Sequence, residues 1–263
     1  MTAEATDPTG AVVIYTSPTT SDAVDGAGVA TCTPLSNTTF PMAETTVTCN
    51  ATDANGNTAT STTFAITVSD TTKPVIASHS NLTAEATSAA GAVVIYTSPT
   101  TSDVVDGAGV ATCSPASNTT FPIATTTITC NATDANGNTA TSTTFTITVS
   151  DTTKPVIASH ANMTAEATGP TGAVVIYTSP TTSDAVDGAG VATCSPASNS
   201  TFPIATTTVT CNATDASGNQ ATSTTFTITV SDTTKPVIAS HSNLIVEATG
   251  PTGAVVILSL IHI

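Results

Sequence analysis

The chain repeats itself with a step of 81 residues, and this period constrains the possible fold more than any other feature. The step separates Cys32 from Cys113 and Cys113 from Cys194, and the heptapeptide DTTKPVI recurs with it. The copies are nearly identical and contain no insertions. A period of this length indicates a tandem array of small domains with one shared structure.

The repeat divides the chain into two complete units, 70–150 and 151–231, flanked by two partial ones. Residues 1–69 match a unit without its opening segment, and a fourth unit, 232–263, breaks off after about a strand and a half. Its last residues, 258–263, read LSLIHI and depart from the repeat, so they are left out of the fold prediction. Both ends indicate a fragment of a longer protein.

Composition and patterning predict an all-β fold. Thr, Val and Ile favour pleated strands, and no stretch carries an apolar stripe of helical period. The complete unit predicts about seven short strands, with segment 99–109 (PTTSDVVDGAG) as a loop because of its Pro, Asp and Gly content. Tandem Ig-like β-sandwich domains joined by short linkers are therefore expected. The predicted strands are Val75–Ala77, Leu82–Thr87, Ala92–Ser98, Val110–Ser114, 119–123, Thr125–Asp134 and 139–149.

One cysteine pair recurs in each unit. The even count and equal spacing predict one disulfide per unit, which in a small domain stabilises the fold by about 3 kcal/mol. Reduced buried thiols are the alternative, whereas a zinc site lacks both the CxxC spacing and further ligands. The predicted bridges are Cys32–Cys49, Cys113–Cys130 and Cys194–Cys211.

The formal net charge of −15 excludes some classes of partner. Nucleic acids and anionic membranes bind proteins through Lys and Arg, of which the chain has only 3. We therefore expect no nucleic-acid partner and no membrane insertion of this segment. Solvation of the surface is the simpler interpretation of the charge, and collection of cations is the other.

A calcium site near the joints between units is the sharper hypothesis for the acidic residues. Hard carboxylate oxygens in an acidic segment suit Ca²⁺, but the Asp134-Ala-Asn-Gly-Asn loop lacks the later Glu and the helices of an EF-hand. Turn formation by Asp and Asn is the alternative. The candidate ligands are Glu85, Asp103, Asp106, Asp151, Asp184 and Asp187, with Asp70 as a further linker carboxylate.

Asn-x-Ser/Thr sequons recur along the chain and are candidate sites for glycans in a secreted protein. A chain rich in Thr and Asn also produces such triplets by chance. The candidate acceptors are Asn37, Asn50, Asn81, Asn118, Asn131, Asn162, Asn199 and Asn212.

No catalytic constellation is evident. The chain has no Gly-x-Ser-x-Gly elbow, and no triad with fixed spacing can be assembled. His79, His160 and His241 recur once per unit without ligand partners, so they are expected at a surface or an interface. The segment is predicted not to be an enzyme.

The ordered motifs DTTKPVI, TAEAT, GAVVIYTSPTTSDVVDG, VATCSPASNTTFPIATTTITC and CNATDANGNTATSTTFTITV resemble the HYR (hyalin repeat) domain over all but the last six residues. The resemblance implies an Ig-like fold, an extracellular location and a link to cell adhesion, without catalytic residues. Many HYR domains carry a second cysteine pair, whereas the matching positions here are Ser78 and Ser142, and Ser159 and Ser223. Without this second cysteine pair, the first strand of each unit has no disulfide bridge to the last strand.

Two functions remain open at this point. The first is a structural stalk or cell-adhesion module of a larger secreted or surface protein, contacting other repeats of the same chain and a cell-surface protein or glycan. The alternative is a glycan- or protein-binding accessory region of a large secreted enzyme. No cofactor other than Ca²⁺ is expected.

Overall fold

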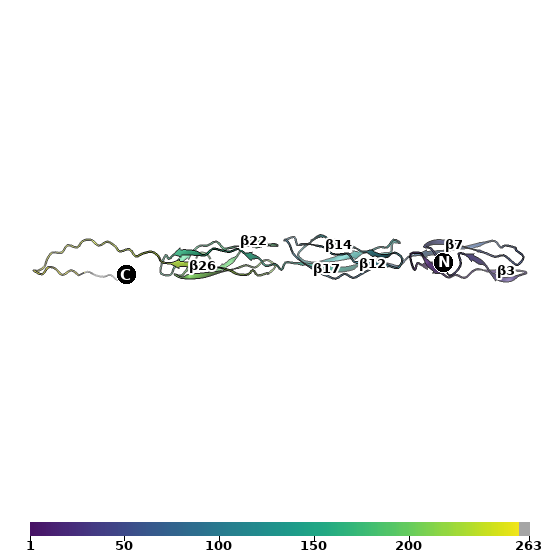
Figure 1. Ribbon diagram of the computed structural model, residues 1–263, viewed down its shortest axis with the longest axis horizontal. Coiled ribbons are helices and arrows are strands. Elements are labelled where there is room, and N and C mark those ends of the chain that lie inside the picture. Colours follow the sequence, from purple (N-terminus) through teal and green to yellow (C-terminus); the bar gives the residue numbers. More distant parts are fainter. Residues whose placement is uncertain (258–263) are drawn as a thin grey trace. The chain divides into compact units, whose positions relative to one another are not determined.

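The computed structural model describes residues 1–257 (Figure 1), and the off-pattern residues 258–263 lie outside the described part. Every regular element in the described part is a strand, which confirms the all-β prediction. No helix with the length and hydropathy of a membrane span is found among these residues. The chain falls into two compact units. The first comprises residues 1–159, 179–193 and 211–224, and the second comprises 160–178, 194–210 and 225–257 of the described part.

The same strands recur in each repeat. The first repeat contains β1 (Thr2–Glu4), β2 (Ala11–Val13), β3 (Thr19–Asp22), β4 (Gly26–Val29), β5 (Thr31–Thr33), β6 (Thr38–Phe40), β7 (Ala43–Asn50) and β8 (Thr62–Ser69). The second contains β9 (Val75–Ile76), β10 (Leu82–Glu85), β11 (Ala92–Val94), β12 (Thr100–Asp103), β13 (Gly107–Val110), β14 (Thr112–Ser114), β15 (Thr119–Phe121), β16 (Thr125–Asn131) and β17 (Thr143–Ser150). The third contains β18 (Val156–Ile157), β19 (Met163–Glu166), β20 (Ala173–Val175), β21 (Thr181–Asp184), β22 (Gly188–Val191), β23 (Thr193–Ser195), β24 (Ser200–Phe202), β25 (Thr206–Asn212) and β26 (Thr224–Ser231).

Each repeat has one four-stranded sheet and two smaller ones. In the second repeat the order of the large sheet is β10-β17-β16-β14, in which β10 runs parallel to β17 and the other pairs are antiparallel. Strands β13-β12-β9 form a three-stranded sheet, and β11 pairs with β15. The third repeat has the equivalent sheets β19-β26-β25-β23, β18-β21-β22 and β20-β24. The first has β1-β8-β7-β5, β2-β6 and β3-β4.

The predicted loop 99–109 was wrong, because it contains most of the β12–β13 hairpin. Its strands are short, mostly exposed and rich in polar residues and glycine, yet they pair from Thr100 with Val110 to Asp103 with Gly107. Gly107 has a φ of 76°, which a residue with a side chain adopts only at a cost. All seven predicted strands are present, most of them shorter than expected, and the hairpin raises the number of strands in the second repeat to nine.

The core of each repeat follows the alternation of its long strands. On β17 the side chains of Phe145, Ile147 and Val149 are buried, as their period-two spacing predicts. Ile128 and Cys130 on the neighbouring strand β16 are fully buried on the same face of the sheet. The intervening threonines face outward or lie half-buried, so that one face of the sheet forms the core and the other meets solvent.

The cysteines are oxidised, as predicted. Cys113 is bonded to Cys130 (S–S 2.00 Å), and the equivalent cysteines of the first repeat, Cys32 and Cys49, are bonded to each other (S–S 2.05 Å). In the third repeat Cys194 and Cys211 are also disulfide-bonded. The paired cysteines of the second repeat are opposite neighbours in the β14–β16 register. The bridge therefore joins adjacent strands of one sheet instead of linking two sheets.

Candidate functional site

The hairpin between β12 and β13 places two carboxylates at one turn. Asp103 ends β12, and its Oδ1 accepts hydrogen bonds from the backbone N–H groups of Val105 (2.8 Å) and Asp106 (3.1 Å). These bonds stabilise the turn and bring Asp106 back towards Asp103. Turn formation uses only one oxygen of Asp103, since its Oδ2 is buried and has no hydrogen-bond partner in the described part of the chain.

A second acidic loop follows β16. Asp134 Oδ1 accepts hydrogen bonds from the N–H groups of Asn136 (3.0 Å) and Asn138 (2.7 Å), and Oδ2 accepts one from Asn138 Nδ2 (2.8 Å). Burial acts to raise the pKa of Asp134, but the bonds from Asn138 and the backbone outweigh it, so the pKa lies below its usual value. Asp106 Oδ2 accepts a bond from the N–H of Ala135 (3.2 Å), which ties the hairpin to this loop.

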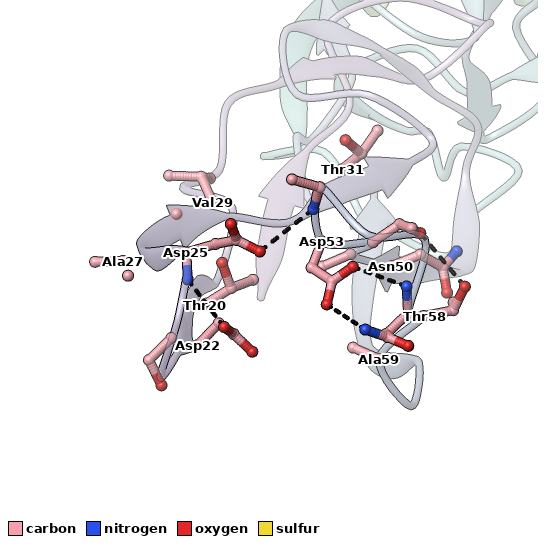
Figure 2. Close-up of a pocket in the computed structure, with 17 residues that line it drawn as sticks. Thr20, Asp22, Asp25, Ala27, Val29, Thr31, Asn50, Asp53, Thr58 and Ala59 are labelled. Atoms are coloured by element: carbon pink, nitrogen blue, oxygen red, sulfur yellow. Dashed lines mark hydrogen bonds between the residues drawn. The ribbon is translucent and has the colours of Figure 1, made fainter.

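The first repeat has the same arrangement, which can be followed in Figure 2. Asp22 forms the hairpin turn, Asp25 Oδ2 accepts the N–H of Ala54 (3.4 Å), and Asp53 bonds Asn57. These carboxylates line an open pocket of about 490 Å³. Asp22 and Asp25 are both exposed, so in this repeat the acidic residues lie in contact with water.

A third carboxylate reaches the hairpin from the segment between two repeats. Asp70 follows β8, is only 6 % exposed, and accepts the N–H of Thr72 through Oδ1 (3.0 Å). Its Oδ2 accepts a hydrogen bond from Asn136 Nδ2 (2.9 Å), and its carbonyl oxygen accepts one from Asn138 Nδ2 (3.2 Å). The loop after β16 therefore positions the linker carboxylate.

Two clusters of carboxylates result, in each of which three residues offer oxygens within 4.8 Å of one another: Asp70, Asp103 and Asp106 in one, and Asp151, Asp187 and Asp215 in the other. All six belong to the first compact unit. Five of these six residues were predicted from the sequence, and Asp215 was not. Its recurrence at the position of Asp134 was the available signal.

The surroundings of Asp70 and Asp151 differ at the position of Asn136. Ser217 stands where the second repeat has Asn136, so the amide that bonds Asp70 Oδ2 has no counterpart beside Asp151. Asp151 is 6 % exposed, and its Oδ2 is buried without a hydrogen-bond partner among residues 1–257. Asp184 Oδ2, at the start of the same hairpin as Asp187, is also buried and without a partner there. The second cluster and the hairpin beside it thus contain two carboxylate oxygens without a hydrogen-bond partner in the described residues, one on Asp151 and one on Asp184.

The tip of the hairpin is apolar and reaches the preceding repeat. Val105 is 4 % exposed and belongs to the hydrophobic cluster of the first repeat, whereas Val24, at the same position of the first hairpin, is 83 % exposed. Val186 contacts the cluster of the second repeat in the same way. These contacts hold the hairpin carboxylates beside the linker Asp.

Glu85 belongs to neither cluster. Its carboxylate accepts hydrogen bonds from the N–H (2.7 Å) and Oγ1 (2.7 Å) of Thr152 and from Oγ1 of Thr153 (2.8 Å). The backbone and side-chain bonds from Thr152 lower the pKa of Glu85. Glu4 and Glu166 accept equivalent hydrogen bonds from the threonines that follow their own repeats. The glutamate therefore fixes the linker after each repeat.

All eight candidate glycan acceptors are exposed, namely Asn37, Asn50, Asn81, Asn118, Asn131, Asn162, Asn199 and Asn212. They fall into three groups. Asn37, Asn118 and Asn199 have φ near +62° to +65° in turns. Asn81 and Asn162 accept a backbone N–H, and the other three accept a serine hydroxyl. Occupancy by glycans remains a prediction.

An aromatic cluster in each complete repeat escaped the sequence analysis. The hydroxyl of Tyr96 donates to the carbonyl oxygen of Pro115, and burial raises the pKa of this tyrosine. Phe145 packs against Tyr96 edge-on, with ring centroids 5.2 Å apart, and stacks on His79 at 4.0 Å. The histidine is half-buried, and its role is therefore packing at the end of the core. Regular recurrence of the tyrosine was the only sequence signal.

The HYR domain family model matches residues 2–68, 69–149 and 150–230. The chain belongs to the HYR domain family. Among curated proteins, it is 37 % identical over 249 residues to "Hyalin" of Strongylocentrotus purpuratus, covering 89 % of this chain and 20 % of that protein. It is 34 % identical over 244 residues to "Hyalin" of Lytechinus variegatus, covering 90 % of this chain and 46 % of that protein. The chain thus spans less than half the length of either relative.

Solved structures show more distant likenesses to these HYR repeats. A protocadherin gamma B7 fragment of extracellular cadherin domains 1–4 is 15 % identical, with a TM-score of 0.30 over 72 % of this chain and 58 % of that one. Immunoglobulin domains 1–4 of Sidekick-1 are 13 % identical, with a TM-score of 0.28 over 88 % and 74 %. Scores at this level do not bear on function.

Where the family resemblance implies a second cysteine pair, the HYR repeats of this chain use hydroxyl groups. Ser142 donates a hydrogen bond to Asn131 Oδ1 (2.5 Å), and Ser223 donates to Asn212. Ser78 is exposed. The first strand of the repeat, β9, is held instead by its antiparallel pairing with β12.

Proposed function

We propose that this segment is a non-catalytic, extracellular adhesion module, in which each HYR repeat presents the same binding surface to a cell-surface protein. The observation that carries the proposal is a pair of exposed aliphatic side chains that recurs in every repeat. On β11 and just after it, Val93 and Ile95 are 58 % and 75 % exposed. Ala92, Val94 and Tyr96 alternate with them and are buried.

The exposed aliphatic pairs are a repeated feature of the fold. They comprise Val12 and Ile14, Val93 and Ile95, and Val174 and Ile176, all at least 57 % exposed. A scattered exposed aliphatic residue needs no explanation, but apolar residues gathered at one place are typical of interaction surfaces. Because the pair recurs with the repeat, several weak contacts can act together and give avidity without any single strong site.

The chemistry of the chain supports an extracellular location. Its cysteines are disulfide-bonded, and structural disulfides persist mainly in oxidising compartments. The net charge of −15 keeps such a chain soluble and disfavours contact with other acidic surfaces. A surface with this balance suits a partner that offers apolar groups without strong negative charge. The same segment can act as a stalk for domains outside it.

The test is adhesion of cells to surfaces coated with the full chain. The variant Ile14→Ser, Ile95→Ser, Ile176→Ser removes the most exposed member of each pair and is expected to reduce adhesion strongly. The matched control is Val29→Ser, Val110→Ser, Val191→Ser, which removes aliphatic groups of similar exposure (67–68 %) elsewhere and should adhere like wild type. Wild-type coating without adhesion, or equal loss in both variants, would refute the proposed surface. Adhesion abolished by removing cell-surface glycans would point to a glycan ligand instead.

A further inference from the structure

We infer that Asp151, Asp187 and Asp215 form a binding site for a Ca²⁺ ion. Three elements supply the site: the segment that follows β17, the hairpin between β21 and β22, and the loop after β25. The inference does not depend on the adhesive function, because it concerns other residues and has its own readout.

The spacing of the carboxylates fits one ion. Oxygens of the three residues lie within 4.8 Å of one another. Two oxygens that bind the same Ca²⁺ at about 2.3–2.6 Å lie at most about 5 Å apart, so the three can share one ion with little movement. The turn bonds to Asp184 from Val186 (2.7 Å) and Asp187 (3.1 Å) hold the hairpin side of the site in place.

An unsatisfied carboxylate oxygen points to a missing ligand at this place. Asp151 is only 6 % exposed, and its Oδ2 has no hydrogen-bond partner among residues 1–257. Asp184 Oδ2, on the same hairpin, is buried and unpartnered in the same part of the chain. Burial of a carboxylate without a bond or a countercharge is strongly unfavourable. A cation at the cluster would supply both a bonding partner for the oxygen and the missing countercharge.

The described part of the chain supplies no countercharge to these carboxylates. It has only 3 Lys and Arg residues in total, and no cationic side chain is paired with these carboxylates within the described residues. Three carboxylates at this separation repel one another unless a positive charge lies between them. The divalent charge must therefore come from solution.

The ligand chemistry selects Ca²⁺. All three residues offer hard oxygen atoms, and the cluster contains no His or Cys, which excludes the usual ligands of zinc and copper. Asp187 is exposed, so water can complete an irregular coordination shell. Ca²⁺ accepts such shells of six to eight oxygens, whereas Mg²⁺ requires near-octahedral geometry.

The preceding cluster provides an internal comparison. Asp70 Oδ2 already accepts the amide of Asn136, so that cluster has one oxygen fewer in need of a partner. Ser217 occupies the equivalent position beside Asp151 and leaves the oxygen free. We therefore expect the cluster of Asp151 to bind Ca²⁺ more tightly than that of Asp70. In the first hairpin Asp22 is exposed and no linker Asp lies beside it in the described chain, so no tight binding is expected there.

The experiment is isothermal titration of the chelator-treated full chain with CaCl₂, together with its thermal unfolding with and without calcium. Wild type should bind with a dissociation constant of about 10⁻⁴–10⁻³ M, the range of extracellular calcium modules, and should melt at a higher temperature with calcium. Asp151→Asn should lose the tighter binding event. Because this change removes a buried charge, its calcium-free midpoint should equal or exceed that of wild type, which shows that it folds.

Two further variants separate a specific site from general charge screening. Ser217→Asn restores the residue of the second repeat and should weaken calcium binding about tenfold, as expected for one competing hydrogen bond of about 1.4 kcal/mol. Asp22→Asn removes an equal charge from the exposed hairpin and should bind like wild type. No binding up to about 10 mM Ca²⁺, well above the expected range, would overturn the site. Binding by Asp151→Asn equal to wild type, or equal loss in Asp22→Asn, would also overturn it.

Discussion

Removing the Cys113–Cys130 bridge should destabilise the second repeat and leave the others unchanged. The two cysteines lie opposite each other in the β14–β16 pair, so the native sheet already holds them together. The bridge therefore acts mainly on the unfolded chain, whose freedom it restricts. The double variant Cys113→Ala, Cys130→Ala removes it without leaving a free thiol.

The magnitude follows from the length of the closed loop. The bridged residues are 17 apart, which corresponds to about 3 kcal/mol in the chain-entropy treatment of disulfides. A loss of that size raises the unfolded population of the repeat on the order of a hundredfold. Both sulfur atoms also lie in the core, since Cys113 and Cys130 are 9 % and 0 % exposed, so their loss acts in the same direction.

Hydrogen exchange followed by mass spectrometry can measure this change repeat by repeat. The slowest amides of β16 and β17 report unfolding of the second repeat, and should exchange on the order of a hundred times faster in the variant. Peptides from β7 and β8 of the first repeat serve as controls in the same sample. Equal exchange of β16 and β17 in both proteins would refute the stabilising role. Equal acceleration in β7 and β8 would refute the expectation that the effect is confined to the second repeat.

Three other changes test local features. Gly91→Ala places a Cβ 1.9 Å from the backbone oxygen of Phe121 at a φ of +105°, and should lower the free energy of unfolding by at least about 2 kcal/mol in denaturant titrations. Wild-type stability would contradict that geometry. Tyr96→Phe removes a buried hydroxyl donor and should lower the same free energy by about 1 kcal/mol. No change would mean that the bond contributes nothing. The bonds from Thr152 lower the folded-state pKa of Glu85 below 4.5. The ionised carboxylate therefore contributes to the free energy of unfolding above pH 4.5, and this contribution is lost as the pH falls through the lowered pKa. Glu85→Gln should therefore flatten the decline of the thermal midpoint between about pH 5 and about pH 3, and an unchanged decline would contradict the linkage.

The long strands could be predicted from sequence because burial there follows simple alternation. Phe145, Ile147 and Val149 recur at every second position, and the structure buries all three. The β12–β13 hairpin could not be predicted in this way. Its strands lack an alternation of buried and polar residues, so they are specified by turn bonds from Asp103 and by the contact of Val105 with the preceding repeat. Neither feature leaves a periodic pattern.

The acidic site was only partly accessible from sequence. A linker carboxylate near the loop of Asp103 could be predicted from the recurrence of Asp70 and Asp103, but Glu85 was an equally good candidate. Only the structure shows that Glu85 binds two threonines of the linker. The difference between Asn136 and Ser217 is visible in the sequence, yet its meaning depends on which oxygen the amide contacts. Whether a buried polar group has a hydrogen-bond partner depends on its neighbours in three dimensions.

The central claim is that the HYR repeats act together in adhesion, because each presents the same exposed surface to its partner. Its most direct test is adhesion to the full chain in a graded series, in which the exposed isoleucine is replaced by Ser in one, two or three repeats at Ile14, Ile95 and Ile176. Avidity predicts that every replacement weakens adhesion, whichever repeat is changed, and that each further replacement lowers it by a similar factor. Adhesion that depends on one particular repeat, or that survives all three replacements, would contradict the claim.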